Sequence, residues 1–335
     1  MKTAISLATF LVLSFSLHSQ TYSTIFAIVA GGTESGENGK SALAGLAATS
    51  TQRPTWSLLT WEGMPLRTFV VSRSGNSPKI LVGGPTGILR PFVNPTGWQL
   101  LTDWHVTEIL CLALDPKMPQ TIMAGTASGF FVTENLGINW EQRDKGLPNR
   151  FVSCILQDPE KPDRFLIGTE LGLYETLDRG RAWRLRGLPS LAIRSMLREP
   201  ESWPGIIWVG TEYGGLHESY DGGLTFEAVD LEDERTSIYT LAGGGANEPI
   251  YAGLFDLGLY KSASPGEIWE PMVGSEVLGT VYAILPVKGS DTIYAGTHKK
   301  GVYRSLDNGI TWEPWGLQGR TVRGLILGDS HWARP

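Results

Sequence analysis

The chain has 335 residues, which is enough for one large domain or two ordinary ones. Its 41 glycines, 20 prolines and low charged fraction of 19% suit short strands and tight turns, and exclude a mainly helical or disordered chain. The net charge is −6 and no Lys/Arg-rich block occurs, so we expect no nucleic-acid partner.

The N-terminal segment has the pattern of an export signal. Lys2 precedes an apolar, serine-punctuated run over residues 4–17, and His18 begins the polar residues that end it. A run of about 14 residues is typical of a signal-peptide core and is short for a membrane span. We predict that residues 1–20 are a signal peptide. Because Leu17 stands where cleavage requires a small residue, an uncleaved N-terminal anchor is the alternative. Either reading predicts an exported protein, in a periplasm, a thylakoid lumen or the extracellular space.

An aromatic residue recurs at a nearly fixed interval after this segment. The intervals are 42, 42, 43, 86 and 43 residues for Trp56, Trp98, Trp140, Trp183, Trp269 and Trp312. Phe226 lies at the midpoint of the long interval. A period in the low forties is typical of a β-propeller. Because each repeat must pack on its neighbours, residues 21–335 are predicted to form a single domain.

Each period contains four short strands. In the last repeat they are predicted over 280–287, 292–297, 301–305 and 310–315, and we name them a to d from the centre outwards. Strand b of the other repeats aligns through a glycine at positions 83, 125, 168, 210, 253 and 296. We interpret these glycines as opening the b–c turn with backbone angles that other residues resist.

The two ends of the chain are out of phase with the repeat. Residues 27–36 resemble strand b and its turn, whereas residues 320–329 resemble strand a. The ends therefore complete one blade, with three strands from the N-terminus and one from the C-terminus, which removes both free sheet edges. The prediction is an all-β, seven-bladed propeller of four-stranded antiparallel blades. Residues 37–45 are interpreted as an inserted loop.

The two cysteines occupy the same position in adjacent repeats. Cys111 and Cys154 are 43 residues apart. Equivalent points on neighbouring inner strands lie roughly 7–10 Å apart, beyond the usual reach of a disulfide. We expect two small buried thiols. Export would permit a disulfide, which is the alternative.

A motif precedes the marker aromatic at the c–d turn. It reads SLDNGITW at 305–312, SYDGGLTF at 219–226 and TLDRGRAW at 176–183, with weaker copies at 133–140 and 262–269. It resembles the Asp-box, or BNR repeat, of sialidases, xyloglucan-degrading glycosidases, sortilin-type receptors and the photosystem II assembly factor. The resemblance covers about residues 24–329 and implies a fold element.

The residue types in the motif also favour a structural role. The carboxylate can accept hydrogen bonds from turn amides, the glycine permits a tight reversal, and the aromatic packs between blades. Three equivalent carboxylates spread around a ring do not form one active site. The predicted structural residues are Asp178, Gly180, Trp183, Asp221, Gly223, Phe226, Asp307, Gly309 and Trp312.

A binding face is expected at the opposite end of the blades, where the b–c turns and d–a loops meet. Arginines recur there at or just before strand a: Arg67, Arg150, Arg194, Arg235, Arg320 and Arg323. Further contact-capable side chains are Trp104, His105, Tyr213 and His298. Arginine is favoured at binding faces because it pairs with carboxylates through two parallel hydrogen bonds. The alternative is an ordinary solvated rim.

No catalytic residue, metal site or cofactor is assigned. The five histidines lack ligand spacing, and neither a phosphate-binding loop nor a Gly-x-Ser-x-Gly element occurs. The Arg-Ile-Pro element of sialidases is absent, and the nearest string is LRPF at 89–92. We therefore predict an exported, monomeric, non-catalytic scaffold that binds a protein partner. The resemblance to the photosystem II assembly factor implies an assembly or stability factor for a membrane complex. The alternative is an extracellular glycosidase of the sialidase or xyloglucanase type, acting on a glycan.

Overall fold

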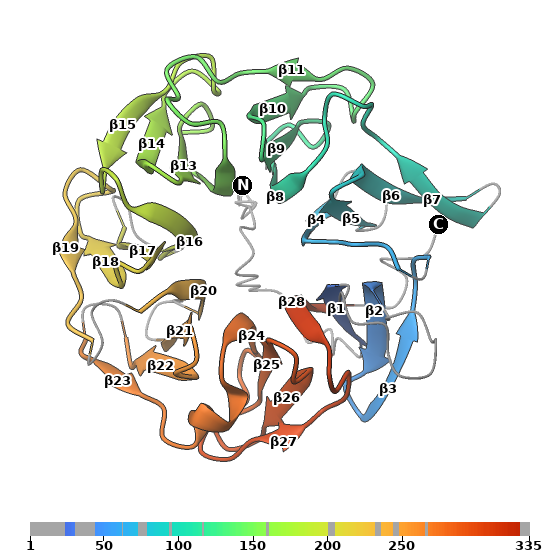
Figure 1. Cartoon of the computed structure of the whole chain (residues 1–335), viewed down its shortest axis with the longest axis vertical. Helices are drawn as coiled ribbons and strands as arrows, with labels where there is room; N and C mark the ends of the chain where they lie inside the picture. The colour runs from blue at the N-terminus through green and yellow to red at the C-terminus, as the bar shows by residue number, and fades with distance from the viewer. Residues whose placement is uncertain are drawn as a thin grey trace, which may run out of the picture.

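A computed structural model describes residues 24–30, 44–61, 63–72, 79–93, 96–115, 117–158, 161–199, 205–231, 236–243, 248–264 and 267–328. The described residues form seven four-stranded sheets arranged as blades around a central axis (Figure 1). This confirms the predicted all-β, seven-bladed architecture. The predicted signal segment 1–20 lies outside the described residues, as does most of the predicted insertion 37–45, whose last residue, Gly45, begins a strand.

Each blade runs from an inner strand beside the axis to an outer strand at the rim. In that order, blade 1 contains β28 (Thr321–Gly328), β1 (Thr24–Ala30), β2 (Gly45–Ser50) and β3 (Arg53–Leu58). Blade 2 contains β4 (Thr68–Ser72), β5 (Lys79–Gly84), β6 (Gly87–Val93) and β7 (Thr96–Leu100). Blade 3 contains β8 (Ile109–Leu114), β9 (Ile122–Thr126), β10 (Phe130–Thr133) and β11 (Glu141–Gln142).

The remaining blades continue in chain order. Blade 4 contains β12 (Val152–Gln157), β13 (Phe165–Thr169), β14 (Gly172–Thr176) and β15 (Arg184–Gly187). Blade 5 contains β16 (Ala192–Arg198), β17 (Ile207–Glu212), β18 (Leu216–Ser219) and β19 (Glu227–Ala228). Blade 6 contains β20 (Ile238–Gly243), β21 (Ile250–Leu254), β22 (Leu259–Ser262) and β23 (Trp269–Pro271). Blade 7 contains β24 (Val281–Pro286), β25 (Ile293–Thr297), β26 (Val302–Ser305) and β27 (Glu313–Pro314).

Helix is nearly absent from the described part of the chain. The described helix is the one-turn 3-10 helix η1 (Ser275–Leu278), which follows β23. Within the described ranges, no helix has the length and apolar character needed to cross a bilayer.

The ring closes as predicted from the out-of-phase ends. Strand β28 pairs antiparallel with β1, from Thr24 opposite Gly328 to Ala30 opposite Thr321. At the outer end of the same junction, the Trp56 indole Nε1 donates a hydrogen bond of 2.8 Å to the carbonyl of Trp315 in blade 7. The ring closure is therefore held by strand pairing near the axis and by the Trp56 hydrogen bond at the rim.

Four marker tryptophans, Trp56, Trp98, Trp140 and Trp183, donate to the blade before their own, whereas Trp312 donates to Gly309 in its own turn. The indole Nε1 of Trp98 donates to the Leu59 carbonyl at 2.9 Å, and Trp140 donates to the Leu101 carbonyl at 2.9 Å. Trp183 donates to the Arg143 carbonyl at 2.8 Å. A buried indole needs an acceptor, and the end of the neighbouring outer strand supplies it. This contact gives the period of 42 to 43 residues a physical cause.

The glycines of strand b have a different role from the predicted one. The glycines at 83, 125, 168, 210, 253 and 296 lie inside the strands, and none has a positive φ. A Cβ on Gly168 would lie 2.6 Å from the Cys154 sulfur and 2.7 Å from Ile193 Cγ2 of the next blade. The prediction that they open the turn is wrong: they permit close contact between inner strands. Other glycines, such as Gly172 at φ 123°, make the turn.

The cysteines are free thiols, as expected. The Cys111 sulfur donates a weak hydrogen bond of 3.6 Å to the Val152 carbonyl of the next blade. Burial raises the pKa of the Cys111 thiol well above its ordinary value and raises the pKa of Cys154 to about 11. Both thiols are therefore protonated at neutral pH and act as small packing groups beside the glycines of strand b.

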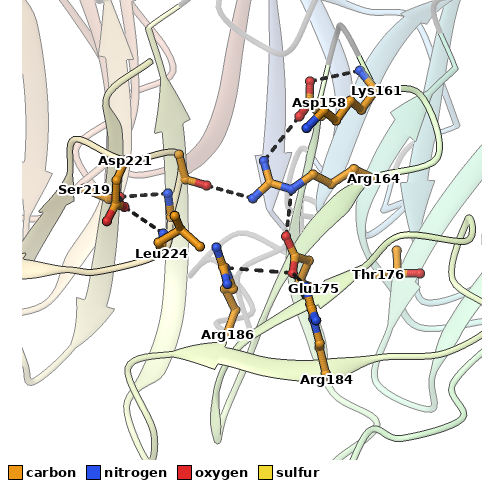
Figure 2. Close-up of polar contacts among 12 residues, drawn as sticks. Asp158, Lys161, Arg164, Glu175, Thr176, Arg184, Arg186, Ser219, Asp221 and Leu224 are labelled. Atoms are coloured by element: carbon orange, nitrogen blue, oxygen red, sulfur yellow. Dashed lines mark hydrogen bonds and ion pairs between the residues drawn. The ribbon is translucent and has the colours of Figure 1, made fainter. Parts of the chain in front are cut away.

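A buried arginine joins blade 4 to the c–d turn of blade 5. Arg164 donates to Glu175 at 2.7 Å, to Asp158 at 3.2 Å and to the Gly222 carbonyl of blade 5 at 2.7 Å. All three side chains are nearly excluded from solvent. Figure 2 shows the guanidinium between the two carboxylates, with the turn of Asp221 beside it. The two acids lie close enough to repel each other if the cation were removed.

Candidate functional site

The Asp-box turns are closed by their own side chains. In blade 5, the Asp221 carboxylate accepts hydrogen bonds from the amides of Leu224 and Thr225 at 2.7 and 2.9 Å. It also accepts from the hydroxyls of Ser219 and Thr225 at 2.8 and 2.7 Å. The Ser219 hydroxyl in turn accepts from the Gly223 amide at 2.8 Å. Four hydrogen bonds from its own turn hold the Asp221 carboxylate in place, which favours a structural role.

The same arrangement recurs in other blades with small changes. Asp178 accepts from Thr176 and from the Ala182 amide at 2.7 and 2.9 Å, and Asp307 accepts from Ser305 at 2.8 Å. Blade 3 uses an amide instead, since Asn135 accepts from the Thr133 hydroxyl at 2.9 Å. The glycines of the turn adopt left-handed backbone, with φ near 90° at Gly180, Gly223 and Gly309. These contacts also explain why strand d begins later than predicted, at Glu313 in blade 7.

Hydrogen bonding keeps these carboxyls ionised. The hydroxyl and then the amide of Thr311, followed by Ser305, lower the pKa of Asp307 to about 2. Burial acts to raise the pKa of Asp221, but hydrogen bonds from Thr225, Ser219 and Leu224 outweigh it and hold that pKa well below its usual range. A carboxyl in this state is a poor proton donor, which argues against a catalytic role.

Replacing Asp307 with asparagine is expected to lower thermal stability near pH 6 and to have little effect below pH 2. The unfolded carboxyl has a pKa of about 3.9. Since the folded pKa is about 2, the ionised group contributes stability above about pH 4, and this contribution is lost as pH falls through about 2. Melting curves of both proteins from pH 7 to pH 1.5 measure the difference. A difference in melting temperature that stays constant with pH would contradict this account of the turn.

The opposite end of the blades carries a repeated irregularity in the inner strand. In blades 3 to 7 and in blade 1, the a–b pairing skips one residue of strand a. The skipped residues are Leu110, Ser153, Arg194, Tyr239, Tyr282 and Arg323. A β-bulge re-aims the side chain of the extra residue and is common beside functional sites. Four consecutive blades therefore present an arginine or a tyrosine at the same place.

We call Arg194, Tyr239, Tyr282 and Arg323 the channel-mouth arc, because they lie at the start of the inner strands around the axis. The rings of Tyr239 and Tyr282 are 4.9 Å apart in an edge-to-face arrangement. The Arg323 guanidinium lies 5.0 Å from the centre of the Tyr282 ring. Such edge-to-face and cation–π contacts hold each member of the arc in place.

The b–c turns add further side chains to the arc. The His298 ring lies 5.9 Å from Tyr282, and its Nδ1 is 3.3 Å from the Thr321 hydroxyl. The Phe255 ring lies 6.4 Å from Tyr239 and is 54% exposed. Glu212, at the end of β17, pairs with Arg194. These contacts confirm that the b–c turns and the start of the inner strands share one end of the molecule.

The predicted arginines divide into two groups. Arg67 pairs with Glu108 at 3.2 Å and Arg150 with Asp144 at 3.2 Å, as Arg194 does with Glu212. Over the ranges that the structure describes, Arg320 and Arg323 have no carboxylate within ion-pair distance. Arg235 lies outside the described residues. Among the described residues, the predicted arginines without a carboxylate partner are thus at the junction of blades 7 and 1. They are not spread evenly around the channel mouth.

The pKa of a histidine reflects this local charge. Burial, then Lys299 and Arg323, lower the pKa of His298 below its ordinary value. Since burial and then the neighbouring cations disfavour a further proton, His298 is neutral at neutral pH.

The remaining predicted contact residues have different surroundings. Trp104 and His105 stack on each other, with ring centres 3.3 Å apart, and His105 lies 3.4 Å from Asp103. Among described residues, no ring contact or hydrogen bond joins this pair to the arc. Tyr213 is 72% exposed on the b–c turn of blade 5. Burial, and to a lesser degree the charges of neighbours that include Tyr213, raises the pKa of Tyr239.

Sequence reasoning missed Tyr239, Tyr282 and Phe255. The two tyrosines occupy the same position of strand a as Arg194 and Arg323, so a residue-by-residue alignment of the inner strands could have found them. The bulge that re-aims them leaves no trace in a strand pattern. No group of three or more His, Cys, Asp or Glu side chains suited to a metal ion occurs in the described part of the chain.

Comparisons with known proteins identify the repeat and the fold. The BNR/Asp-box repeat model matches residues 303–314, within blade 7. No curated protein sequence matches the chain significantly. Since the matched segment is one turn with its flanking strands, it identifies the repeat motif of this chain.

Solved propellers share the architecture at low identity. The extracellular domain of the putative hybrid two component system BT4673 from B. thetaiotaomicron is 18% identical, with a TM-score of 0.62 over 85% of this chain and 38% of that one. The GH74 xyloglucanase from Xanthomonas campestris is 18% identical, with a TM-score of 0.55 over 70% of this chain and 43% of that one. This chain therefore spans less than half the length of either.

A third similar structure is closer to this chain in size. YCF48 from Cyanidioschyzon merolae is 19% identical, with a TM-score of 0.56 over 80% of this chain and 90% of that one. A second YCF48 structure, described as bound to D1 peptide, is 16% identical with a TM-score of 0.51 over 70% of this chain and 77% of that one. At these identities the similarity establishes the fold.

Proposed function

We propose that this chain is an exported, non-catalytic propeller that binds a polypeptide segment of a partner protein at its channel mouth. We further propose that it acts as an assembly or stability factor for a membrane complex. The observation that carries the proposal is the charge arrangement at the mouth. Three of its acidic side chains, Glu108, Asp144 and Glu212, are each paired with an arginine, whereas Arg323 is left without a carboxylate among the described residues.

This arrangement fits a binding face better than a glycosidase. Hydrolysis of a glycoside uses two carboxyl groups that flank the scissile bond, about 5–10 Å apart, one of which must carry a proton. A carboxylate held by a guanidinium is stabilised in its ionised form and is less available for that chemistry. An unpaired arginine beside tyrosines is instead a common feature of protein interfaces.

Exposed apolar side chains on the b–c turns support a protein partner. Leu171, Tyr213 and Phe255 lie on consecutive blades 4, 5 and 6 and are all exposed. Large exposed apolar groups among charged ones are typical of interaction sites, and the c–d turns also carry them, at Ile138, Leu224 and Ile310. The YCF48 structure described as bound to D1 peptide is a similar propeller with a peptide ligand, which makes a peptide the first partner class to test.

Charge-reversal variants should show which end of the molecule binds the partner. In extracts of the native host, Arg323→Glu and Arg150→Glu are expected to reduce partner recovery at least about tenfold. Arg323→Glu would repel a carboxylate of the partner, and Arg150→Glu leaves an added negative charge beside Asp144. Arg53→Glu, at the c–d turn of blade 1, is the matched control and should retain the partner. Equal recovery with all three variants would contradict the proposal.

The second candidate is a glycosidase, favoured by the similarity to the GH74 xyloglucanase fold. The purified chain is incubated with xyloglucan and with chromogenic sialosides and glucosides. Turnover that is lost in Glu212→Gln would support the enzyme and overturn a non-catalytic role. We expect no turnover above a heat-inactivated sample.

A further inference from the structure

Two tyrosines and a phenylalanine form an aromatic group on one side of the channel mouth. Tyr239 and Tyr282 are half-buried and meet edge to face, while Phe255 contributes a more exposed ring 6.4 Å from Tyr239. The bulges in β20 and β24 aim both tyrosines from the same position. Because their backbone and ring contacts fix them, the protein loses little side-chain entropy when a ligand ring packs against them.

Unpaired positive charge lies directly beside this aromatic group. Arg323 is exposed, rests against the Tyr282 ring and has no carboxylate partner among the described residues. His298 contacts the other edge of Tyr282 and lies in the field of Lys299 and Arg323. Aromatic rings therefore lie beside a guanidinium that has no carboxylate partner within the described ranges.

We infer that the junction of blades 6, 7 and 1 is a subsite for an aromatic side chain of the partner polypeptide with a carboxylate next to it in sequence. The aromatic side chain packs against Tyr239, Tyr282 and Phe255, and the carboxylate pairs with Arg323. This inference rests on the proposed function and narrows the partner to an acidic-aromatic segment.

The chemistry of the junction favours a polypeptide over a neutral glycan. A sugar ring needs a broad exposed aromatic face, whereas Tyr239 and Tyr282 are half-buried and meet edge to face at 61°. A neutral sugar also brings no carboxylate to Arg323. A peptide carboxylate supplies that partner with charge-assisted hydrogen bonds.

Four end-blocked peptides provide the test on the full chain. The first is a Gly/Ser peptide with a central Glu-Trp-Glu; the others replace Trp with Ala, both Glu with Gln, or all three. By titration calorimetry or fluorescence anisotropy, we expect the first to bind at least about tenfold more tightly than each of the others. Loss of either the ring or the charge removes one of the two contacts.

Variants of the protein assign each contact to its side chain. Tyr282→Leu should abolish the discrimination between Trp and Ala, and Arg323→Gln should abolish the discrimination between Glu and Gln. The matched controls Tyr220→Leu and Arg53→Gln, on c–d turns, should bind all four peptides as the unaltered chain does. Circular dichroism melts confirm that each variant is folded.

Two outcomes would overturn the subsite: equal binding of all four peptides, or binding of a neutral xyloglucan oligosaccharide that Tyr282→Leu removes. If the peptides do not discriminate but Arg323→Glu and Arg150→Glu still lose the partner from extracts, the subsite is wrong and the protein-binding face stands. If neither experiment shows binding, both proposals fail together.

Discussion

Replacing Arg164 with methionine is expected to destabilise the propeller by about 3–5 kcal/mol, because it removes the buried cation that joins two buried carboxylates. Arg164 donates to both Asp158 and Glu175, and the side chains of both acids are only 2% exposed. It also donates to the Gly222 carbonyl of the next blade, so the substitution opens the contact between blades 4 and 5. Methionine keeps the apolar stem and removes the charge, which restricts the effect to electrostatics and hydrogen bonding.

The neighbouring arginine provides a matched control for this prediction. Arg184 donates to the same Glu175 carboxylate at 2.7 Å, but its side chain is 62% exposed (Figure 2). An exposed pair of this kind is worth less than about 1 kcal/mol, so Arg184→Met should be mild. Urea unfolding of the two variants gives the comparison. Similar losses in both would show that burial does not decide the strength of this network.

Replacing Gly210 with alanine is expected to cost about 2–3 kcal/mol through overpacking between blades 5 and 6. The added Cβ would lie 2.4 Å from the Ser195 hydroxyl and 2.7 Å from Ile238 Cβ of the next inner strand. The Ser195 hydroxyl can rotate away, but the Ile238 Cβ is attached to a paired backbone and cannot withdraw without shifting β20. A thermal melt with a urea titration measures the loss.

Gly289→Ala separates crowding from backbone preference. Gly289 has φ 73°, and no heavy atom lies within 4 Å of the position that an alanine Cβ would occupy. Its substitution therefore tests the left-handed backbone alone and should cost about 1 kcal/mol. If Gly210→Ala were no more costly than this control, the close approach of inner strands would not explain the glycines of strand b.

The repeat explains how much of the fold could be predicted. Each blade needs one large aromatic residue against its neighbour. The regular spacing of the aromatic residues from Trp56 to Trp312 therefore predicts the repeat length directly. Ring closure by β28 and β1 followed from the phase of the two ends. The role of Gly210 and its equivalents could not be read in this way, since glycine suits both a turn and a close contact.

The sequence predicted which end of the fold carries the candidate site, but it identified only some of the residues there. Arg194 and Arg323 do lie at the inner strands, yet Arg194 is paired with Glu212, whereas Arg323 has no carboxylate partner in the part of the chain that the structure describes. Such pairing depends on Glu212 reaching across from β17, a contact between residues 18 positions apart that no local pattern specifies. Tyr239 and Tyr282 were missed because a bulge, which has no sequence signature in these strands, turns them toward the mouth.

Photo-cross-linking from two tyrosine positions of one blade tests the central claim most directly. Tyr213 lies on the b–c turn and is 72% exposed, whereas Tyr220 lies on the c–d turn at the other end and is 49% exposed. A photoreactive phenylalanine is placed at either position, and the protein is irradiated in host extract. We predict a discrete cross-linked polypeptide from position 213 that is absent from position 220. The same polypeptide captured from position 220 alone, or from both positions equally, would contradict a binding face at the channel mouth.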